Sequence, residues 1–125
     1  MSIQRASPSF VIAGKSFSQT PSLQLVYKHS PDCGFSRHAL TVVSAFADAH
    51  PDVPVILVDV IDQRAHSQRL AADLRVRHAS PQVIFVRDGR ADWSESHGRI
   101  SLETLERALA DLTQIVVRDD KARSA

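Results

Sequence analysis

Residues 23–36 read Leu-Gln-Leu-Val-Tyr-Lys-His-Ser-Pro-Asp-Cys-Gly-Phe-Ser, and they contain the only cysteine of the chain, Cys33. The apolar start of this stretch, with a β-branched and an aromatic residue, predicts a buried strand over residues 23–28. From Gly34 onward, apolar residues recur at helical spacing until His50 and Pro51 end the pattern. The stretch therefore predicts a strand, a turn that carries Cys33, and a helix.

The rest of the chain continues this alternation of strands and helices. Residues 53–60 are nearly all apolar and β-branched, which is typical of a strand covered on both faces. Asp88-Gly89 predicts a hairpin turn, and Ser101 and Thr104 predict a capped helix start. The further expected elements are a helix over 64–74, strands over 83–86 and 90–94, and a helix over 102–112. This order, βαβαββα, predicts an α/β thioredoxin-like fold: a central mixed four-stranded sheet flanked by helices.

Length and composition indicate one globular domain with a single core. We expect an N-terminal arm over 1–20, the thioredoxin-like domain over 21–115 and a C-terminal tail over 116–125. The arm contains one short apolar patch, at 10–13, and we expect it to form a little helix or strand packed on the domain. Fifteen basic and fourteen acidic residues are scattered without runs, so we expect neither a nucleic acid nor a membrane as partner.

A single cysteine favours a reducing compartment, because secreted chains of this size usually pair their cysteines. The first twenty residues contain no continuous apolar segment typical of a signal peptide, and no stretch approaches the ~18 apolar residues of a membrane span. We therefore expect a soluble cytoplasmic protein. The six histidines lack metal-ligand spacing, so we expect no metal site.

Cys33 is the candidate nucleophile, because a helix start favours thiolate through unpaired N–H groups and the helix dipole. The dipole contributes only about 0.3–1 kcal/mol, so neighbouring side chains must help. We expect the Ser36 hydroxyl to donate a hydrogen bond to the sulfur and Arg37 to favour the thiolate, whereas the Asp32 carboxylate opposes it. Gly34 at the turn predicts an exposed thiol, and the alternative is a small buried hydrophobic residue.

Cys33-Gly34-Phe35-Ser36 is identical to the CGFS motif of monothiol glutaredoxins, which use this cysteine and glutathione to hold a [2Fe–2S] cluster. The remaining glutaredoxin pattern is absent, since no Thr-Val-Pro precedes the expected hairpin and no Gly-Gly follows it. This resemblance does not extend to the glutathione-binding residues.

A longer resemblance is to the monothiol bacilliredoxins of the bacillithiol system. It rests on residues 26–30, 58–64 and 76–82, which read Val-Tyr-Lys-His-Ser, Val-Asp-Val-Ile-Asp-Gln-Arg and Val-Arg-His-Ala-Ser-Pro-Gln. The motif of that family is usually Thr, Arg or Gln followed by Cys-Pro-Ile-Ser, so Cys33 and Ser36 agree with it, whereas Asp32, Gly34 and Phe35 depart. Gly98 also replaces an aromatic residue that is usual in the family.

The resemblance implies removal of bacillithiol from S-bacillithiolated cytosolic proteins, with bacillithiol as co-substrate and no bound cofactor. Cys33 would be the nucleophile, and Ser80 and Pro81, a proline that this fold usually holds in the cis form, would bind substrate as an added strand. Lys28, Arg64 or Arg37 would meet the malate carboxylates of bacillithiol. Two alternatives stay open: a glutaredoxin-like [2Fe–2S] cluster carrier, and a catalytically silent thioredoxin-fold binding module.

Overall fold

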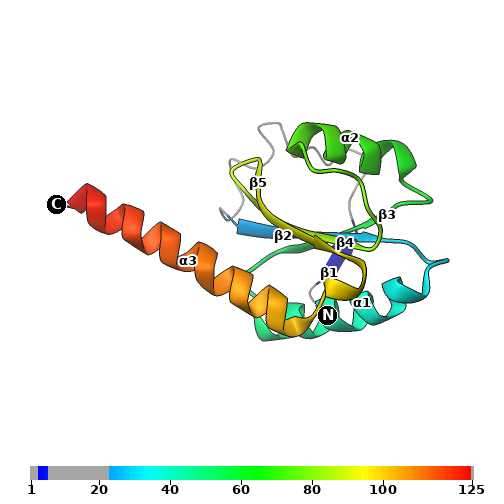
Figure 1. The fold of residues 1–125 in the computed structure, drawn as a ribbon, viewed down its shortest axis with the longest axis horizontal. Coiled ribbons are helices and arrows are strands. Elements are labelled where there is room, and N and C mark those ends of the chain that lie inside the picture. Colours follow the sequence, from blue (N-terminus) through cyan, green and yellow to red (C-terminus); the bar gives the residue numbers. More distant parts are fainter. Residues whose placement is uncertain (1–2, 6–22, 125) are drawn as a thin grey trace.

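The computed structural model describes residues 3–5 and 23–124, with side chains described for residues 3 and 23–113. In this part of the chain, five strands form one sheet in the order β1-β3-β2-β4-β5, flanked by helices on both faces (Figure 1). β3 is parallel to β1 and β2, whereas β4 is antiparallel to β2 and β5. The elements are β1 (Ile3–Arg5), β2 (Leu23–His29), α1 (Gly34–Ala49), β3 (Val55–Asp59), α2 (Arg64–Leu74), β4 (Gln82–Arg87), β5 (Arg90–Ser96), η2 (His97–Arg99) and α3 (Leu102–Ser124).

The thioredoxin-like order of strands and helices is confirmed, and the expected four-stranded sheet gains one strand. Ile3–Arg5, within the expected N-terminal arm, forms β1 and pairs with β3 from Ile3 opposite Val55 to Arg5 opposite Leu57. A short element in the arm was expected, but three residues are too few to show the alternation that identifies a strand, so the sequence did not locate it. The apolar patch at 10–13 lies outside the described residues.

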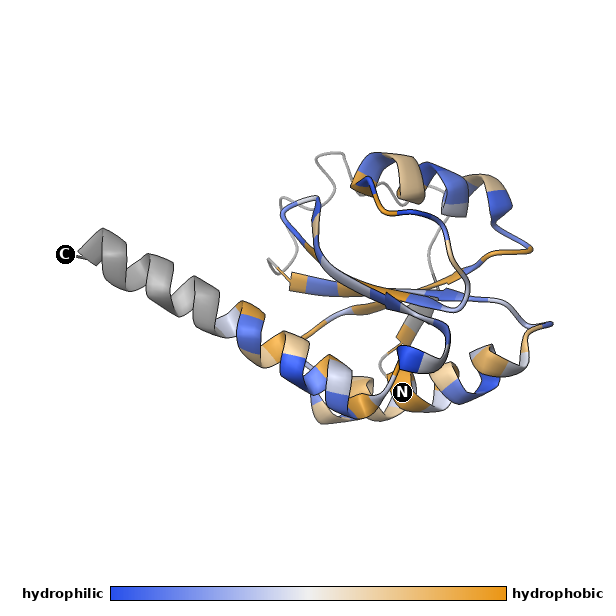
Figure 2. Ribbon diagram, in the orientation of Figure 1, coloured by the Kyte–Doolittle hydropathy of each residue, from blue (hydrophilic) through white to orange (hydrophobic). Residues whose placement is uncertain are grey.

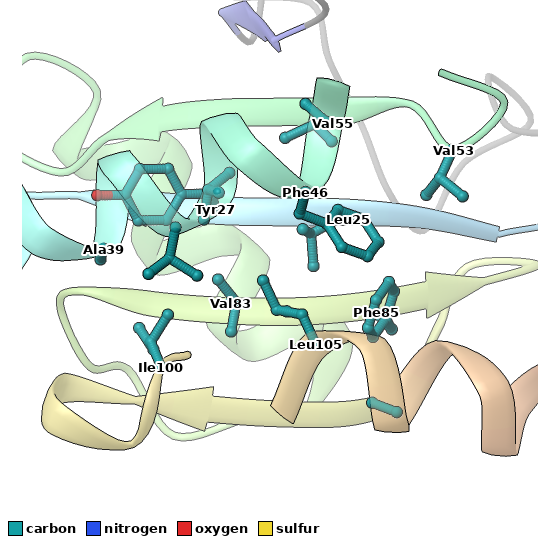
Figure 3. Packing of buried hydrophobic residues seen from close by; sticks show 14 of the residues in the cluster. Leu25, Tyr27, Ala39, Phe46, Val53, Val55, Val83, Phe85, Ile100 and Leu105 are labelled. Atoms are coloured by element: carbon teal, nitrogen blue, oxygen red, sulfur yellow. The ribbon is translucent and has the colours of Figure 1, made fainter. Parts of the chain in front are cut away.

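The sheet separates two hydrophobic cores, because successive side chains of a strand point to opposite faces. Leu25 and Tyr27 of β2 face α1 and α3 in the larger core (Figure 3), and Val26 faces α2 in the smaller one. Hydrophobic residues run along β3, whereas hydrophilic residues interrupt β2 (Figure 2). One of them is Lys28, which lies on the α2 side with its side chain fully buried.

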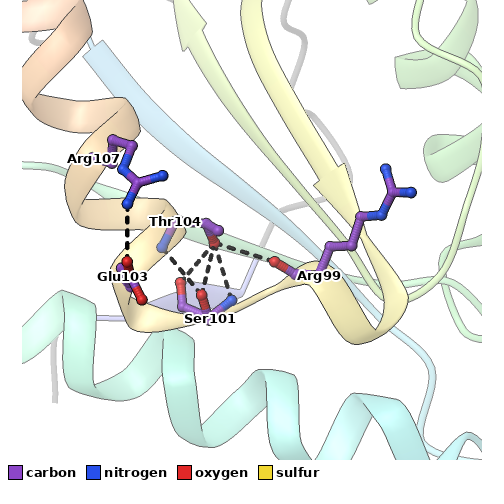
Figure 4. A network of polar contacts seen from close by, with 5 residues as sticks. All are labelled: Arg99, Ser101, Glu103, Thr104 and Arg107. Atoms are coloured by element: carbon purple, nitrogen blue, oxygen red, sulfur yellow. Dashed lines mark hydrogen bonds and ion pairs between the residues drawn. The ribbon is translucent and has the colours of Figure 1, made fainter.

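The predicted cap of α3 is present, with Thr104 at the position that Glu usually takes. The Thr104 N–H donates to Ser101 Oγ at 3.1 Å, and the Ser101 N–H donates to Thr104 Oγ1 at 3.1 Å (Figure 4). The helix continues to Ser124, so the expected end at 112 is wrong, and α3 runs on through most of the residues expected to form the C-terminal tail. No glycine or proline follows residue 101, so the sequence contains no signal that ends the helix.

Replacing Ser101 with Ala should destabilise the protein by about 1 kcal/mol, because the first turn of α3 loses its side-chain acceptor. Urea denaturation of both proteins measures this difference. Ser94→Ala, at an exposed position of β5, is the control and should change the free energy of unfolding by less than about 0.5 kcal/mol. Equal losses in the two variants would mean that the cap does not stabilise α3.

Candidate active site

Cys33 is the N-cap residue of α1, with extended backbone angles of φ −107° and ψ 128°. Its N–H donates to the Ser30 carbonyl at 3.1 Å, and its carbonyl accepts from the Ser36 N–H at 3.0 Å. The side chain is partly exposed and makes no capping hydrogen bond. The turn therefore holds the backbone firmly and leaves the sulfur available for chemistry.

Ser36 stabilises this turn through its side chain, which differs from its expected role. The residue is fully buried, and its Oγ accepts the Ser30 N–H at 3.1 Å. Within residues 23–113, the structure gives no hydrogen bond from this hydroxyl to the Cys33 sulfur. The hydroxyl acts here as the acceptor of a bond that closes the loop from Ser30 to Ser36, and its donation to the thiolate stays a prediction.

Tyr27 and His29, which sequence reasoning did not place in the site, form a second link to α1. Tyr27 Oη donates to the Ser36 carbonyl at 3.1 Å and lies 2.7 Å from His29 Nδ1. Because a phenol has one proton and a carbonyl only accepts, His29 Nδ1 is the donor to the tyrosine oxygen. Tyr27 lies in a buried strand. The apolar pattern of that strand indicates a core residue, and nothing in it indicates a polar role for the phenol.

Burial raises the pKa of Tyr27, and the nearby negative charge of a Cys33 thiolate adds to this rise, whereas the side-chain hydroxyl of Ser36 opposes it. The phenol therefore stays protonated and remains a donor. Burial lowers the pKa of His29, and the Asp59 carboxylate opposes this shift. The imidazole is consequently neutral near pH 7, which agrees with one proton on Nδ1.

Asp32 and Arg37 flank Cys33 and are both exposed. Neither makes an ion pair or a side-chain hydrogen bond within the part of the chain that the structure describes. Charges in such positions act on the thiolate across solvent, where screening weakens their effect. The opposing roles of these two residues stay predictions.

Phe35 and Gly98, two of the departures from the bacilliredoxin pattern, lie next to each other. The Phe35 ring is 56% exposed and meets the His97 ring edge-on, with centroids 6.2 Å apart. A Cβ atom at Gly98 would lie 3.7 Å from this phenyl ring. The aromatic side chain at position 35 therefore stands beside the place that a side chain at position 98 would occupy.

Ser80 and Pro81 are joined by a cis peptide bond, as expected from the fold. Pro81 is buried, and its carbonyl accepts the His97 N–H at 3.1 Å. The Ser80 Oγ is buried without a hydrogen-bond partner among the described residues. No backbone partner is described for Ser80 either, so its N–H and carbonyl are available to another strand.

Lys28, expected to meet a carboxylate of the small thiol, is fully buried and forms hydrogen bonds within the protein. Its Nζ donates to the Ser67 carbonyl at 3.0 Å and lies 3.2 Å from His78 Nδ1. Burial lowers the pKa of Lys28 to about 8. Since an ammonium group can only donate, His78 Nδ1 is the acceptor and the ring proton resides on Nε2.

Beside Lys28, a cavity of about 320 Å³ opens between the end of β3, α2 and the loop that precedes β4. Arg64 lines this cavity together with Ser67 and His78, the two partners of Lys28. The structure thus brings the predicted residues Lys28 and Arg64 to one place, whereas Arg37 is not part of the described lining. The other lining residues are Val60, Ile61 and Gln68.

Residues 3–5 and 23–124 contain no group of three or more His, Cys, Asp or Glu side chains that could hold a metal ion. No helix described in the structure has both the length and the apolar character that a membrane span requires.

Replacing Lys28 with Met should change how stability depends on pH. Between pH 8 and 10.5 the folded protein releases the Lys28 proton, whereas the unfolded chain retains it, so the wild type gains stability as pH rises. The free energy of unfolding of the wild type, relative to the variant, should increase by about 1–3 kcal/mol from pH 7 to 10. Urea denaturation at several pH values from 7 to 10 measures this difference. A constant difference up to pH 10 would contradict the lowered pKa.

Replacing Ser36 with Cys should create a dithiol that oxidises to an intramolecular disulfide, because positions 33 and 36 meet at the first turn of α1. Intact-mass measurement after mild oxidation should show a monomer lighter by two hydrogens. Ser44→Cys, further along the same helix, is the control and should form no such bond. Absence of the disulfide in the Ser36 variant would contradict the placement of Cys33 at the helix start.

Comparisons with known proteins agree with this geometry. Among solved structures, one described as an oxidoreductase with a thioredoxin fold has a TM-score of 0.72 and 25% identity, over 86% of this chain and 93% of that chain. Thioredoxin NaTrxh from Nicotiana alata has a TM-score of 0.71 and 17% identity, over 88% and 91% of the two chains. The family model described as monothiol bacilliredoxin BrxC matches residues 13–105, most of the chain. The chain therefore belongs to the monothiol bacilliredoxin BrxC family and has the thioredoxin fold.

Proposed function

We propose that this protein removes bacillithiol from mixed disulfides on cytoplasmic proteins through Cys33. The observation that carries the proposal is a partly exposed thiol at the N-cap of α1 in a chain without a second cysteine. A thiolate at a helix start meets unpaired N–H groups and the positive end of the helix dipole. One thiol is sufficient for exchange when a second small thiol completes the cycle.

The reaction proceeds in two exchange steps. First, the Cys33 thiolate attacks the bacillithiol sulfur of the mixed disulfide, and the client cysteine leaves as a thiolate that takes a proton from water. Cys33 is then joined to bacillithiol. Next, the thiolate of a second bacillithiol attacks the bacillithiol sulfur of this adduct, which releases bacillithiol disulfide and restores the Cys33 thiolate. Each step breaks one S–S bond and forms another, so no further oxidant or reductant is needed.

Ser80 supports binding of the client as an added strand. Its N–H and carbonyl have no described partner, and the cis bond to Pro81 places them next to the start of β4. Main-chain hydrogen bonds of this kind bind a client without reading its side chains. Phe35 and Ile61 are 56% and 50% exposed and supply apolar contact area near the two helix starts. This combination suits an enzyme with several protein substrates.

The test uses one client protein that carries bacillithiol on a single cysteine. Wild-type protein with excess bacillithiol should release the client thiol, and Cys33→Ser should reduce the rate to that without protein, because a hydroxyl has no accessible anion near pH 7. Mass spectrometry should detect the Cys33 adduct with bacillithiol in the wild type only. Ser44→Ala, in the middle of α1, is the control and should turn over normally.

Three outcomes would contradict the proposal. Undiminished turnover by Cys33→Ser would remove Cys33 as the nucleophile. Failure of wild-type Cys33 to react with any disulfide would favour a silent binding module, and a brown, thiol-dependent chromophore in the purified protein would favour a cluster carrier.

A further inference from the structure

We propose that the cavity between α2 and the loop before β4 binds a carboxylate of the small thiol that is joined to Cys33. This assignment rests on the proposed function and specifies which part of the substrate the protein recognises. It adds His78 and Gln68 to the candidate residues and gives Arg64 and Lys28 distinct roles.

The cavity has the size and the lining of a subsite for a small polar group. Its volume of about 320 Å³ is at the lower end of the range of roughly 300–1,000 Å³ for small-molecule pockets. Arg64, Gln68 and His78 supply hydrogen-bond donors, and none of the described lining residues is acidic. A guanidinium can bind both oxygens of a carboxylate through two parallel hydrogen bonds.

Lys28 provides a positive charge behind the lining and sets the proton position on His78. Its ammonium group is buried between the Ser67 carbonyl and His78 Nδ1, two partners that belong to residues of the cavity wall. With Nδ1 used as an acceptor, His78 presents an N–H at Nε2. Burial lowers the pKa of His78, and the positive charges of Lys28 and Arg64 lower it further. The ring therefore stays a neutral donor near pH 7. Gln82 keeps the loop in place, since its amide donates to the Arg77 carbonyl at 3.0 Å.

The position of the cavity indicates that the small thiol, and not the client protein, occupies it. Its wall follows the ends of β3 and β2, where the Val60 N–H donates to the His29 carbonyl at 2.9 Å. α1 and α2 begin at this same end of the sheet (Figure 1). His78 also lies just before Ser80 and Pro81, so the cavity adjoins the segment proposed to hold the client strand. A small thiol bonded to Cys33 therefore has an anionic subsite on the α2 side of the sheet.

The experiment compares one client protein with three adducts: bacillithiol, glutathione and β-mercaptoethanol, of which only the last has no carboxylate. Arg64→Gln should lower kcat/KM about tenfold for the carboxylate-bearing adduct that the protein uses. Release of β-mercaptoethanol should change less than about twofold. Arg69→Gln removes the same charge from an exposed position on the same helix, outside this cavity, and should affect none of the adducts. Comparing the loss of kcat/KM that Arg64→Gln causes on the bacillithiol and glutathione adducts distinguishes a malate carboxylate from the carboxylates of glutathione.

A second measurement does not depend on turnover. Titration of the wild type with free malate should shift the NMR signals of the His78 ring, and Arg64→Gln should weaken this binding about tenfold. Equal loss of activity on all three adducts, or no loss on any, would overturn the subsite. Unchanged His78 signals would also overturn it. If malate binds but no adduct is turned over, the proposed function fails while the anion site stands.

Discussion

The hydrogen bond from the Ser30 N–H to Ser36 Oγ is the constraint on which the site depends, because it closes the loop that carries Cys33. β2 ends at His29 and α1 begins at Gly34, so only four residues turn the chain through the change of direction. Ser36 closes this loop from inside the protein, and Tyr27 adds a second bond to the Ser36 carbonyl. A serine in place of a resolving cysteine therefore has a structural role besides preventing an internal disulfide.

Lys28 is the energetically unfavourable feature of the fold. An ammonium group in a core costs free energy unless it is hydrogen-bonded, and here burial lowers the pKa of Lys28 to about 8. Two acceptors, the Ser67 carbonyl and His78 Nδ1, compensate part of this cost. A methionine of similar length would fill the space without any charge. The retained charge is consistent with a function in the adjacent cavity, where it faces the wall formed by α2 and His78.

Elements with strong periodicity could be predicted from the sequence. The helix over 64–74 has the expected bounds, and the cis bond before Pro81 follows from the position of that proline in the fold. Contacts that depend on the path of a side chain could not be predicted. The sequence does not indicate which groups the Ser36 hydroxyl and the Tyr27 phenol bind. In the folded protein these are the Ser30 N–H and the Ser36 carbonyl. β1 could not be located because three residues show no periodicity. The end of α3 was placed too early because no glycine or proline follows its first residue to mark where the helix ends.

The topology explains why cysteine, cis proline and cavity share one end of the sheet. β2 and β3 are parallel, so their carboxyl ends lie side by side, and α1 and α2 both start there. Each helix directs the positive end of its dipole toward that side, where unpaired N–H groups favour negative charge. Cys33 is the N-cap residue of α1. Arg64 is the first residue of α2 and lines the cavity with His78, beside Lys28. One end of the sheet thus favours two anions at once, a thiolate at α1 and a carboxylate at α2. This is the charge pattern of the proposed encounter between the Cys33 thiolate and an acidic small thiol on a client cysteine, before the new S–S bond forms.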